Sequence, residues 1–151
     1  MTTPLAQAKA EYAERTDFWP AGLVMALETA APRLGFVWVI ECVEALVDLL
    51  QPENRDQLQQ WIDQLEAFGG ETEEAAEETV RQIWPPTHDP FRIALANLFA
   101  AAWKLSHDIS GGAYRTLLIN ALRELGAMPG CRALGGAPIF DLFEQLEGRR
   151  R

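Results

Sequence analysis

The segment from about residue 33 to residue 50 constrains the fold more than any other part of this chain. Its charged residues Glu41, Glu44 and Asp48 fall at positions i, i+3 and i+7, so on a helix they form one narrow stripe. Almost every other position is apolar: Phe36, Val37, Trp38, Ile40, Val43, Leu46, Val47 and Leu50. A helix that is apolar on most sides must be surrounded by other elements. We therefore expect it at the centre of a helical bundle, with only the stripe near water.

A second segment, at about 90–106, has the same character. Asp89 is placed to cap its amino terminus, and Pro90 suits the first helical position. Its apolar residues cover most of the helix surface: Phe91, Leu95, Leu98, Phe99, Ala102 and Trp103. We expect this helix to pack on the helix at 33–50, and the alanines at 100–102 permit a close approach.

Prolines, glycines and capping residues divide the rest of the chain into shorter helical segments. Gly111 and Gly112 are expected to break the chain, and 128–138 reads as a glycine- and proline-rich loop. No run of five residues alternates cleanly between apolar and polar, so no strand is predicted. The remaining helices are expected at about 4–14, 20–30, 52–68, 72–83, 113–125 and 139–146.

The predicted fold class is therefore all-α, a bundle or array of seven to eight helices with two nearly all-apolar helices at its centre. A length of 151 residues favours a single domain. We assign residues 1–148 to that domain and 149–151 to a basic tail.

Composition disfavours several kinds of partner. The net charge of -9 disfavours binding to nucleic acid and to anionic membranes. The longest apolar stretch, 34–50, is too short and too often interrupted by acidic residues to suggest a membrane span. Residues 1–12 lack the apolar core of a signal peptide, so we expect a cytoplasmic protein in which Cys42 and Cys131 are free thiols.

The two histidines give little support for a metal site. Each precedes an aspartate, in His88-Asp89 and His107-Asp108. Helical metal-dependent phosphohydrolases use such pairs together with a further upstream histidine and a distant aspartate. No histidine precedes His88 here, and Asp89 is explained as a helix cap. We expect His107 and Asp108 to lie at the carboxyl end of the helix at 90–106.

The sequence also lacks a residue pattern typical of nucleophilic catalysis. Cys131 has no histidine near it in the sequence, and Ser106 and Ser110 do not lie in a nucleophile elbow. The sequence therefore predicts a protein that is not an enzyme and that carries no cofactor.

The densest charged feature is the acidic cluster at 71–78. Its like charges four residues apart slightly destabilise an isolated helix, so their presence suggests a use in binding basic side chains of a partner. A plain solvated face is the alternative. We expect Asp56 and Asp63, on the polar face of the helix at 52–68, to extend this surface, and Trp84 to anchor the partner. The acidic candidates within the cluster are Glu71, Glu73, Glu74, Glu77 and Glu78.

Two stretches carry a family resemblance. One is Trp38 to Leu50, with its Glu-Cys-Val-Glu core, followed by Pro52 to Arg55 and by Trp61. The other runs from Ala100 to Tyr114 and includes Trp103 and His107. Together they resemble all-helical immunity proteins found beside bacterial polymorphic toxins. The resemblance implies an all-α fold and an inhibitory, non-catalytic role.

These observations favour a protein-binding protein, an immunity-type inhibitor or adaptor that docks on a basic protein partner, such as a toxin, through an acidic helical surface. Rim charges of this kind set the association rate more than the affinity. The alternative is a structural or oligomerisation module of a larger bacterial assembly. A small metal-dependent hydrolase is the less favoured third hypothesis. The oligomeric state is left open.

Overall fold

The structure is a computed structural model of the chain, and it describes residues 3–68, 73–83, 88–106 and 111–149. Over these residues it is built of helices and turns, without a strand, so the predicted all-α class is confirmed. The helices are α1 (Pro4–Ala13), α2 (Trp19–Ala30), α3 (Leu34–Leu50), α4 (Arg55–Glu66), α5 (Glu73–Ile83), α6 (Pro90–Ser106), α7 (Gly111–Gly126), α8 (Pro129–Arg132) and α9 (Ala137–Arg149).

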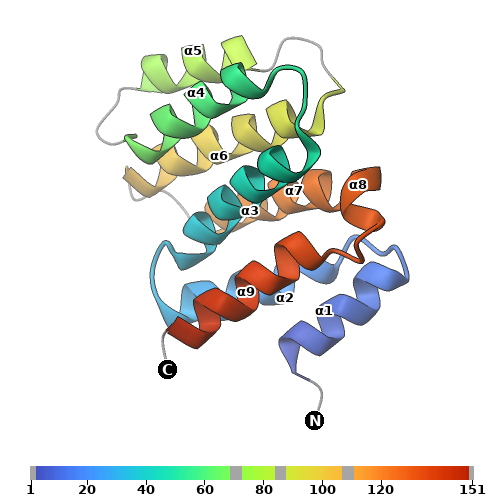
Figure 1. The fold of residues 1–151 in the computed structure, drawn as a ribbon. Coiled ribbons are helices and arrows are strands. Elements are labelled where there is room, and N and C mark those ends of the chain that lie inside the picture. The colour runs from blue at the N-terminus through green and yellow to red at the C-terminus, as the bar shows by residue number, and fades with distance from the viewer. Residues whose placement is uncertain (1–2, 69–72, 84–87, 107–110, 150–151) are drawn as a thin grey trace.

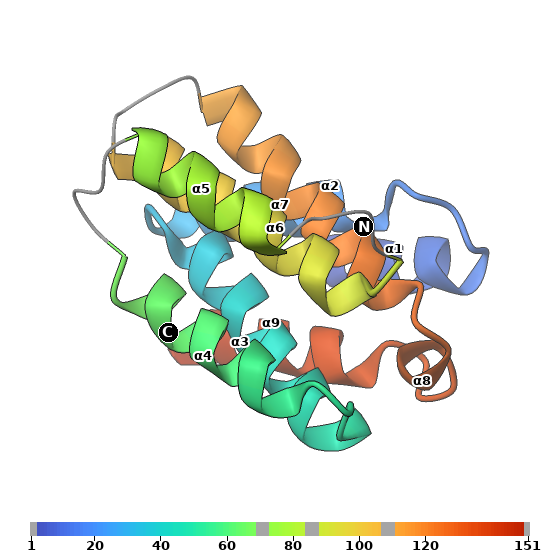
Figure 2. The same ribbon diagram turned by 90° about the horizontal axis from the view of Figure 1, so that it is seen from above.

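The helices are arranged around α3 and α7 (Figure 1). The helices α4, α5 and α6 lie at one end of the molecule, whereas α1, α2 and α9 lie at the other, where both termini are found. Seen from above, α5 covers α6, and α4 lies beside α3 (Figure 2). The short helix α8 connects α7 to α9.

The helix α3 packs against α2, α4, α6, α7 and α9. Most of its apolar residues are accordingly buried, and Trp38, Val39, Cys42, Val43 and Leu46 are fully so. Val37 and Leu49 differ from this expectation, because they are 41% and 51% exposed. The helix α6 packs against α3, α4, α5 and α7. All the described helices except α5 and α8 place several side chains in one shared hydrophobic core. Burial of this extent supplies most of the stability of a helical domain.

Trp38 fixes α9 on α3. Its indole Nε1 donates a hydrogen bond to the carbonyl of Ile139 at 3.0 Å, and its ring meets the edge of Phe143 with centroids 5.4 Å apart. The next residue of α9 after Ile139, Phe140, packs against Tyr12 and Trp19 in an edge-to-face triad. Such pairs add directional preference to apolar burial.

Arg92 joins the three helices at the upper end of the molecule. Its guanidinium donates to the carbonyls of Ile83 and Gln82 at 2.8 and 3.1 Å, which caps the carboxyl end of α5. The same guanidinium lies over the ring of Trp61 in α4, 5.4 Å from the ring centroid. One α6 side chain thus holds α4 and α5 in place.

Several element limits differ from the prediction. Part of the segment predicted as a loop at 128–138 forms α8, because Pro129 suits a first helical position. Gly111 and Gly112 do not break the chain but begin α7, where glycine costs less than in a helix interior. The helix α9 is longer than the predicted 139–146, at both ends. The assignment of a domain to 1–148 and a tail to 149–151 stays a prediction.

Arg15 gives a test of backbone energetics. It follows α1 in a left-handed conformation (φ 63°), and the hydrogen bonds of Arg15 and Thr16 to Tyr12 and Glu11 form a Schellman motif in which glycine is usual. We predict that Arg15→Gly raises the free energy of unfolding by about 1 kcal/mol. The matched change is Gly135→Ala, at φ +63° with open space around it. It should lower that free energy by a similar amount in urea denaturation. If both variants have the same free energy of unfolding as the wild type, this explanation is contradicted.

Candidate functional site

The acidic residues predicted on α5 are exposed where the structure describes them. Glu74, Glu77 and Glu78 point to solvent, and Glu78 pairs with Arg81 at 3.3 Å. The backbone of Glu73 begins α5. The prediction also named Glu71 and Trp84, which lie outside the described residues.

The two aspartates predicted on α4 are exposed as well. Asp63 accepts a hydrogen bond from Gln59 at 3.0 Å, and Asp56 lies in the first turn of the helix, where a negative charge is favourable. The helix α4 packs on α3 and α6, whereas α5 packs on α6. The predicted acidic residues therefore form two groups, one along each helix.

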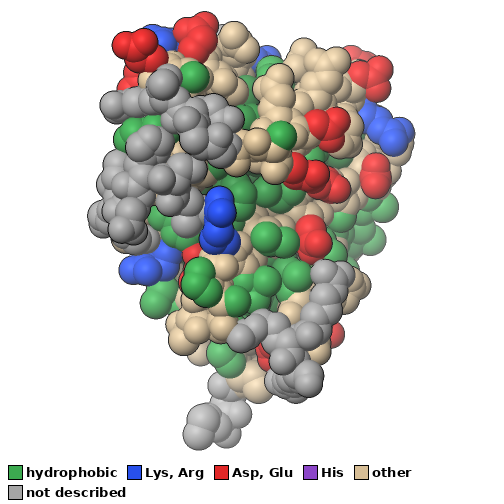
Figure 3. Space-filling view, turned by 90° about the vertical axis from the view of Figure 1, so that its left-hand side faces the viewer, with side chains coloured by type: hydrophobic (Ala, Val, Ile, Leu, Met, Phe, Trp, Pro, Cys, Tyr) green, Lys and Arg blue, Asp and Glu red, His purple; other side chains and the backbone are tan. Residues whose placement is uncertain are grey.

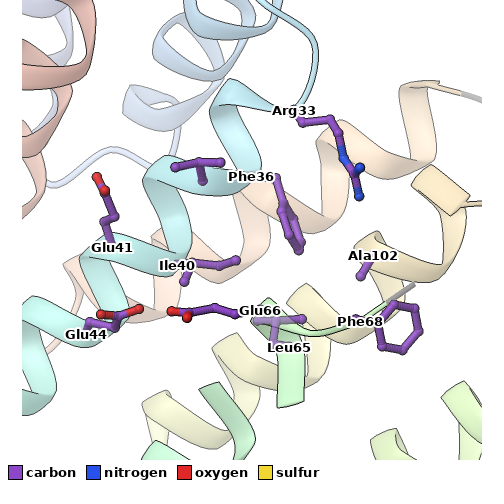
Figure 4. Close-up of a pocket in the computed structure, with 10 residues that line it drawn as sticks. Arg33, Phe36, Ile40, Glu41, Glu44, Leu65, Glu66, Phe68 and Ala102 are labelled. Carbon is purple, nitrogen blue, oxygen red and sulfur yellow. The ribbon is translucent and has the colours of Figure 1, made fainter. Parts of the chain in front are cut away.

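A groove between α3 and α4 brings together residues that the sequence analysis did not combine. It has a volume of about 570 Å³ and ends against α6 (Figure 4). Its walls are mostly apolar, with three glutamates and one arginine among them. The lining residues are Arg33, Phe36, Val37, Ile40, Glu41, Glu44, Leu65, Glu66, Phe68 and Ala102.

Glu44 and Glu66 form the acidic end of the groove. Figure 4 shows their carboxyl groups side by side, one from α3 and one from the last turn of α4. A hydrogen bond to Glu66, burial, and the charges of Glu66, Glu41 and Asp48 raise the pKa of Glu44 from 4.5 to about 7. Two carboxyl groups that lie side by side share a proton more readily than they both ionise. Near neutral pH the carboxyl group of Glu44 is therefore about half protonated.

Arg33 forms the opposite end. It precedes α3 in a left-handed conformation (φ 70°), and its side chain does not cap the helix. Figure 4 shows its guanidinium extending toward Phe68 and Ala102, across Phe36 from the two glutamates. Among the described residues Arg33 has no ion-pair partner. A bulky residue in this backbone region costs about 1 kcal/mol, and such strain is common at functional sites.

The apolar floor between these ends is well ordered by packing. Phe36 and Ile40 are each only 7% exposed, and Leu65 only 2%. Phe68 meets the edge of Phe99 with centroids 5.9 Å apart. The groove therefore keeps its shape without an occupant, which reduces the entropic cost of binding.

Figure 3 shows one face of the molecule. Apolar side chains gather in its middle, and several acidic side chains lie to one side of them, with basic side chains scattered over the face. The sequence analysis found the acidic stripe of α3, with Glu41 and Glu44. It did not single out Glu66 or Arg33, because their approach to the stripe depends on how α4 and the α2–α3 turn are placed.

The residues considered for catalysis have structural surroundings. Asp89 caps α6 as predicted, accepting from the backbone N–H of Phe91 and from Asn54, each at 3.0 Å. Cys131 is fully buried, and burial raises the pKa of its thiol, which opposes formation of a nucleophilic thiolate. His107, Asp108 and Ser110 lie outside the described residues.

Within the described ranges, no three side chains of histidine, cysteine, aspartate or glutamate are grouped so that they could hold a metal ion. No described helix is both long enough and apolar enough to cross a membrane.

Comparisons of the chain with protein-family models, with curated proteins and with solved structures find no match. The structure therefore defines the class of the protein by its architecture. It is all-helical, with a groove beside its central helix that is acidic at one end and basic at the other.

The raised pKa of Glu44 predicts how stability depends on pH. Because its pKa is about 7 in the folded protein and near 4.5 when unfolded, the folded state binds more protons between these values. Stability from this group is fully present below pH 4.5 and is lost as pH rises through 7. Glu44→Gln should therefore be about 1–2 kcal/mol more stable than the wild type at pH 8, after allowance for solvent screening, and nearly equal to it at pH 4.5.

Glu74→Gln is the control, because it removes an equal charge from an exposed position on α5. Denaturation at several pH values measures both variants. A gain of stability at pH 8 that is the same for the two variants would show that net charge, rather than the Glu44–Glu66 contact, is responsible.

Proposed function

We propose that this protein is a non-catalytic binding protein, an immunity-type inhibitor or adaptor, that docks on a basic protein partner through its acidic helical surface. The observation that carries the proposal is the pairing of Glu44 with Glu66 at the rim of a preformed apolar groove. Carboxyl groups held together at a cost to their ionisation are typical of functional sites. A cation from a partner relieves this repulsion, whereas an anionic partner would increase it.

The distribution of charge supports the same class of partner. The exposed acidic residues of α4 and α5 lie at the same end of the molecule as the groove. The whole chain carries a net charge of -9. Such a field speeds the association of a basic protein. Apolar residues in the groove then supply contacts of the kind that determine how long the complex lasts.

The proposal is tested with the tagged protein as bait in its own cells, followed by identification and purification of the captured protein. We predict a captured protein of basic isoelectric point. Asp56→Lys with Asp63→Lys, and Glu74→Lys with Glu78→Lys, should each slow its association at least fivefold at low salt, with a smaller effect at 0.5 M salt, because salt screens surface charges. Surface plasmon resonance measures these rates.

The control for net charge is Glu14→Lys with Glu144→Lys, which changes the charge equally at the end of the molecule that holds α1 and α9. If the association rate of this control falls by as much, net charge controls association, and the α4 and α5 surfaces have no special part in it. Capture of only a second copy of this chain, measured by light scattering, would instead favour an oligomerisation module.

A further inference from the structure

We propose that the groove between α3 and α4 binds an extended segment of the partner that has a basic side chain at one end, a carboxylate at the other and apolar residues between them. This inference rests on the proposed function and specifies the part of the partner that enters the groove. It is carried by the opposite charges at the two ends of the groove and by its apolar middle.

The charges of the groove fix the charges of the segment. Glu44 and Glu66 lie together at one end, and Arg33, with no ion-pair partner among the described residues, lies at the other. A lysine or arginine of the partner therefore fits beside the glutamates. A carboxylate fits beside Arg33, which can bind it with two parallel hydrogen bonds. A uniformly basic segment would leave Arg33 opposed by a like charge.

The geometry of α3 fixes the length of the segment. Arg33 and Glu44 are eleven residues apart along this helix, which corresponds to about 16 Å at 1.5 Å per residue. An extended chain rises about 3.3 Å per residue, so the charged ends of a five-residue segment lie about 13 Å apart, and their long side chains cover the remainder. Phe36 and Ile40 lie between the two charged ends, and Leu65 and Phe68 face them from α4 and the residues after it. These four side chains would contact the apolar residues of the segment.

The basic side chain would compete with the proton on Glu44. The groups that face Glu44 are Glu66 from α4, and Glu41 and Asp48 from α3 itself. Asp48 is in turn paired with Arg55 at 3.6 Å. Of the other helices packed on α3, α6 contributes only Ala102 to the groove, and α2, α7 and α9 contribute no lining residue. Affinity should therefore be about tenfold lower at pH 6 than at pH 8, in proportion to the ionised fraction of Glu44.

The experiment uses short peptides with blocked ends, titrated into the full-length protein and followed by nuclear magnetic resonance. The first peptide is lysine-alanine-leucine-alanine-glutamate, in which the charged residues and the leucine face the same side of an extended chain. It is tested together with its reversed sequence because either chain direction can place the charges correctly. The control is the isomer alanine-lysine-glutamate-leucine-alanine, which has the same composition and net charge but adjacent charged residues. We expect one of the first two peptides to bind at least fivefold more tightly than the isomer at pH 8.

Three variants connect this preference to the groove. Arg33→Gly removes the cation while it relaxes the left-handed backbone, so the protein remains folded, and Glu66→Gln removes one carboxylate. Each should reduce the preference to less than twofold. Glu74→Gln on α5 removes an equal charge outside the groove and should leave the preference intact. Equal binding of all three peptides to the wild type, or a preference that survives Arg33→Gly and Glu66→Gln, would overturn the inference.

These results are distinguishable from those that test the proposed function. If the peptides show no preference while capture of a basic partner still depends on the charges of α4 and α5, the groove inference fails and the proposed function stands. If the peptide preference is found but no basic partner is captured, the groove inference is supported as a peptide site and the proposed function fails.

Discussion

Burial of most of the circumference of α3 is the constraint on which the rest of the structure depends. Five of the described helices pack against it, and most of its apolar side chains, including Trp38, are buried. The charged residues Glu41, Glu44 and Asp48 therefore lie at its open edge, together with the exposed Val37. Part of this edge forms one wall of the groove. The core and the candidate site are therefore two consequences of the same sequence pattern.

The position of α4 gives this edge its chemical character. Because α4 packs on both α3 and α6, its last turn brings Glu66 against Glu44. Fixing two carboxyl groups together costs free energy unless they share a proton or receive a cation. Arg33 at the far end, in a strained backbone conformation, completes a groove with opposite charges at its ends. The contact between Glu44 and Glu66 and the strained backbone of Arg33 each cost stability, one at each end of the groove. Such costs beside a well-packed apolar surface are typical of a binding site.

The sequence was sufficient to predict the parts of the fold that depend on local pattern. The limits of the central helix are within one residue of those expected at 33–50, and Asp89 caps α6 as its position indicates. The short helix α8 was missed because proline and glycine dominate its four residues. The groove was missed for a different reason: its acidic end needs one glutamate from each of two helices, and no local pattern reports the approach of Glu66 to Glu44. The roles expected for Asp56, Asp63 and the α5 glutamates remain predictions.

The most direct test is a titration of the Glu44 carboxyl carbon by nuclear magnetic resonance, in the wild type and in Glu66→Gln. If α3 presents its acidic stripe to α4, the pKa of Glu44 is about 7 in the wild type, since Glu66 is the largest cause of its rise, and is clearly lower in the variant. A pKa near 4.5 in both proteins would show that these two carboxyl groups do not meet, and the groove described here would lose its acidic end.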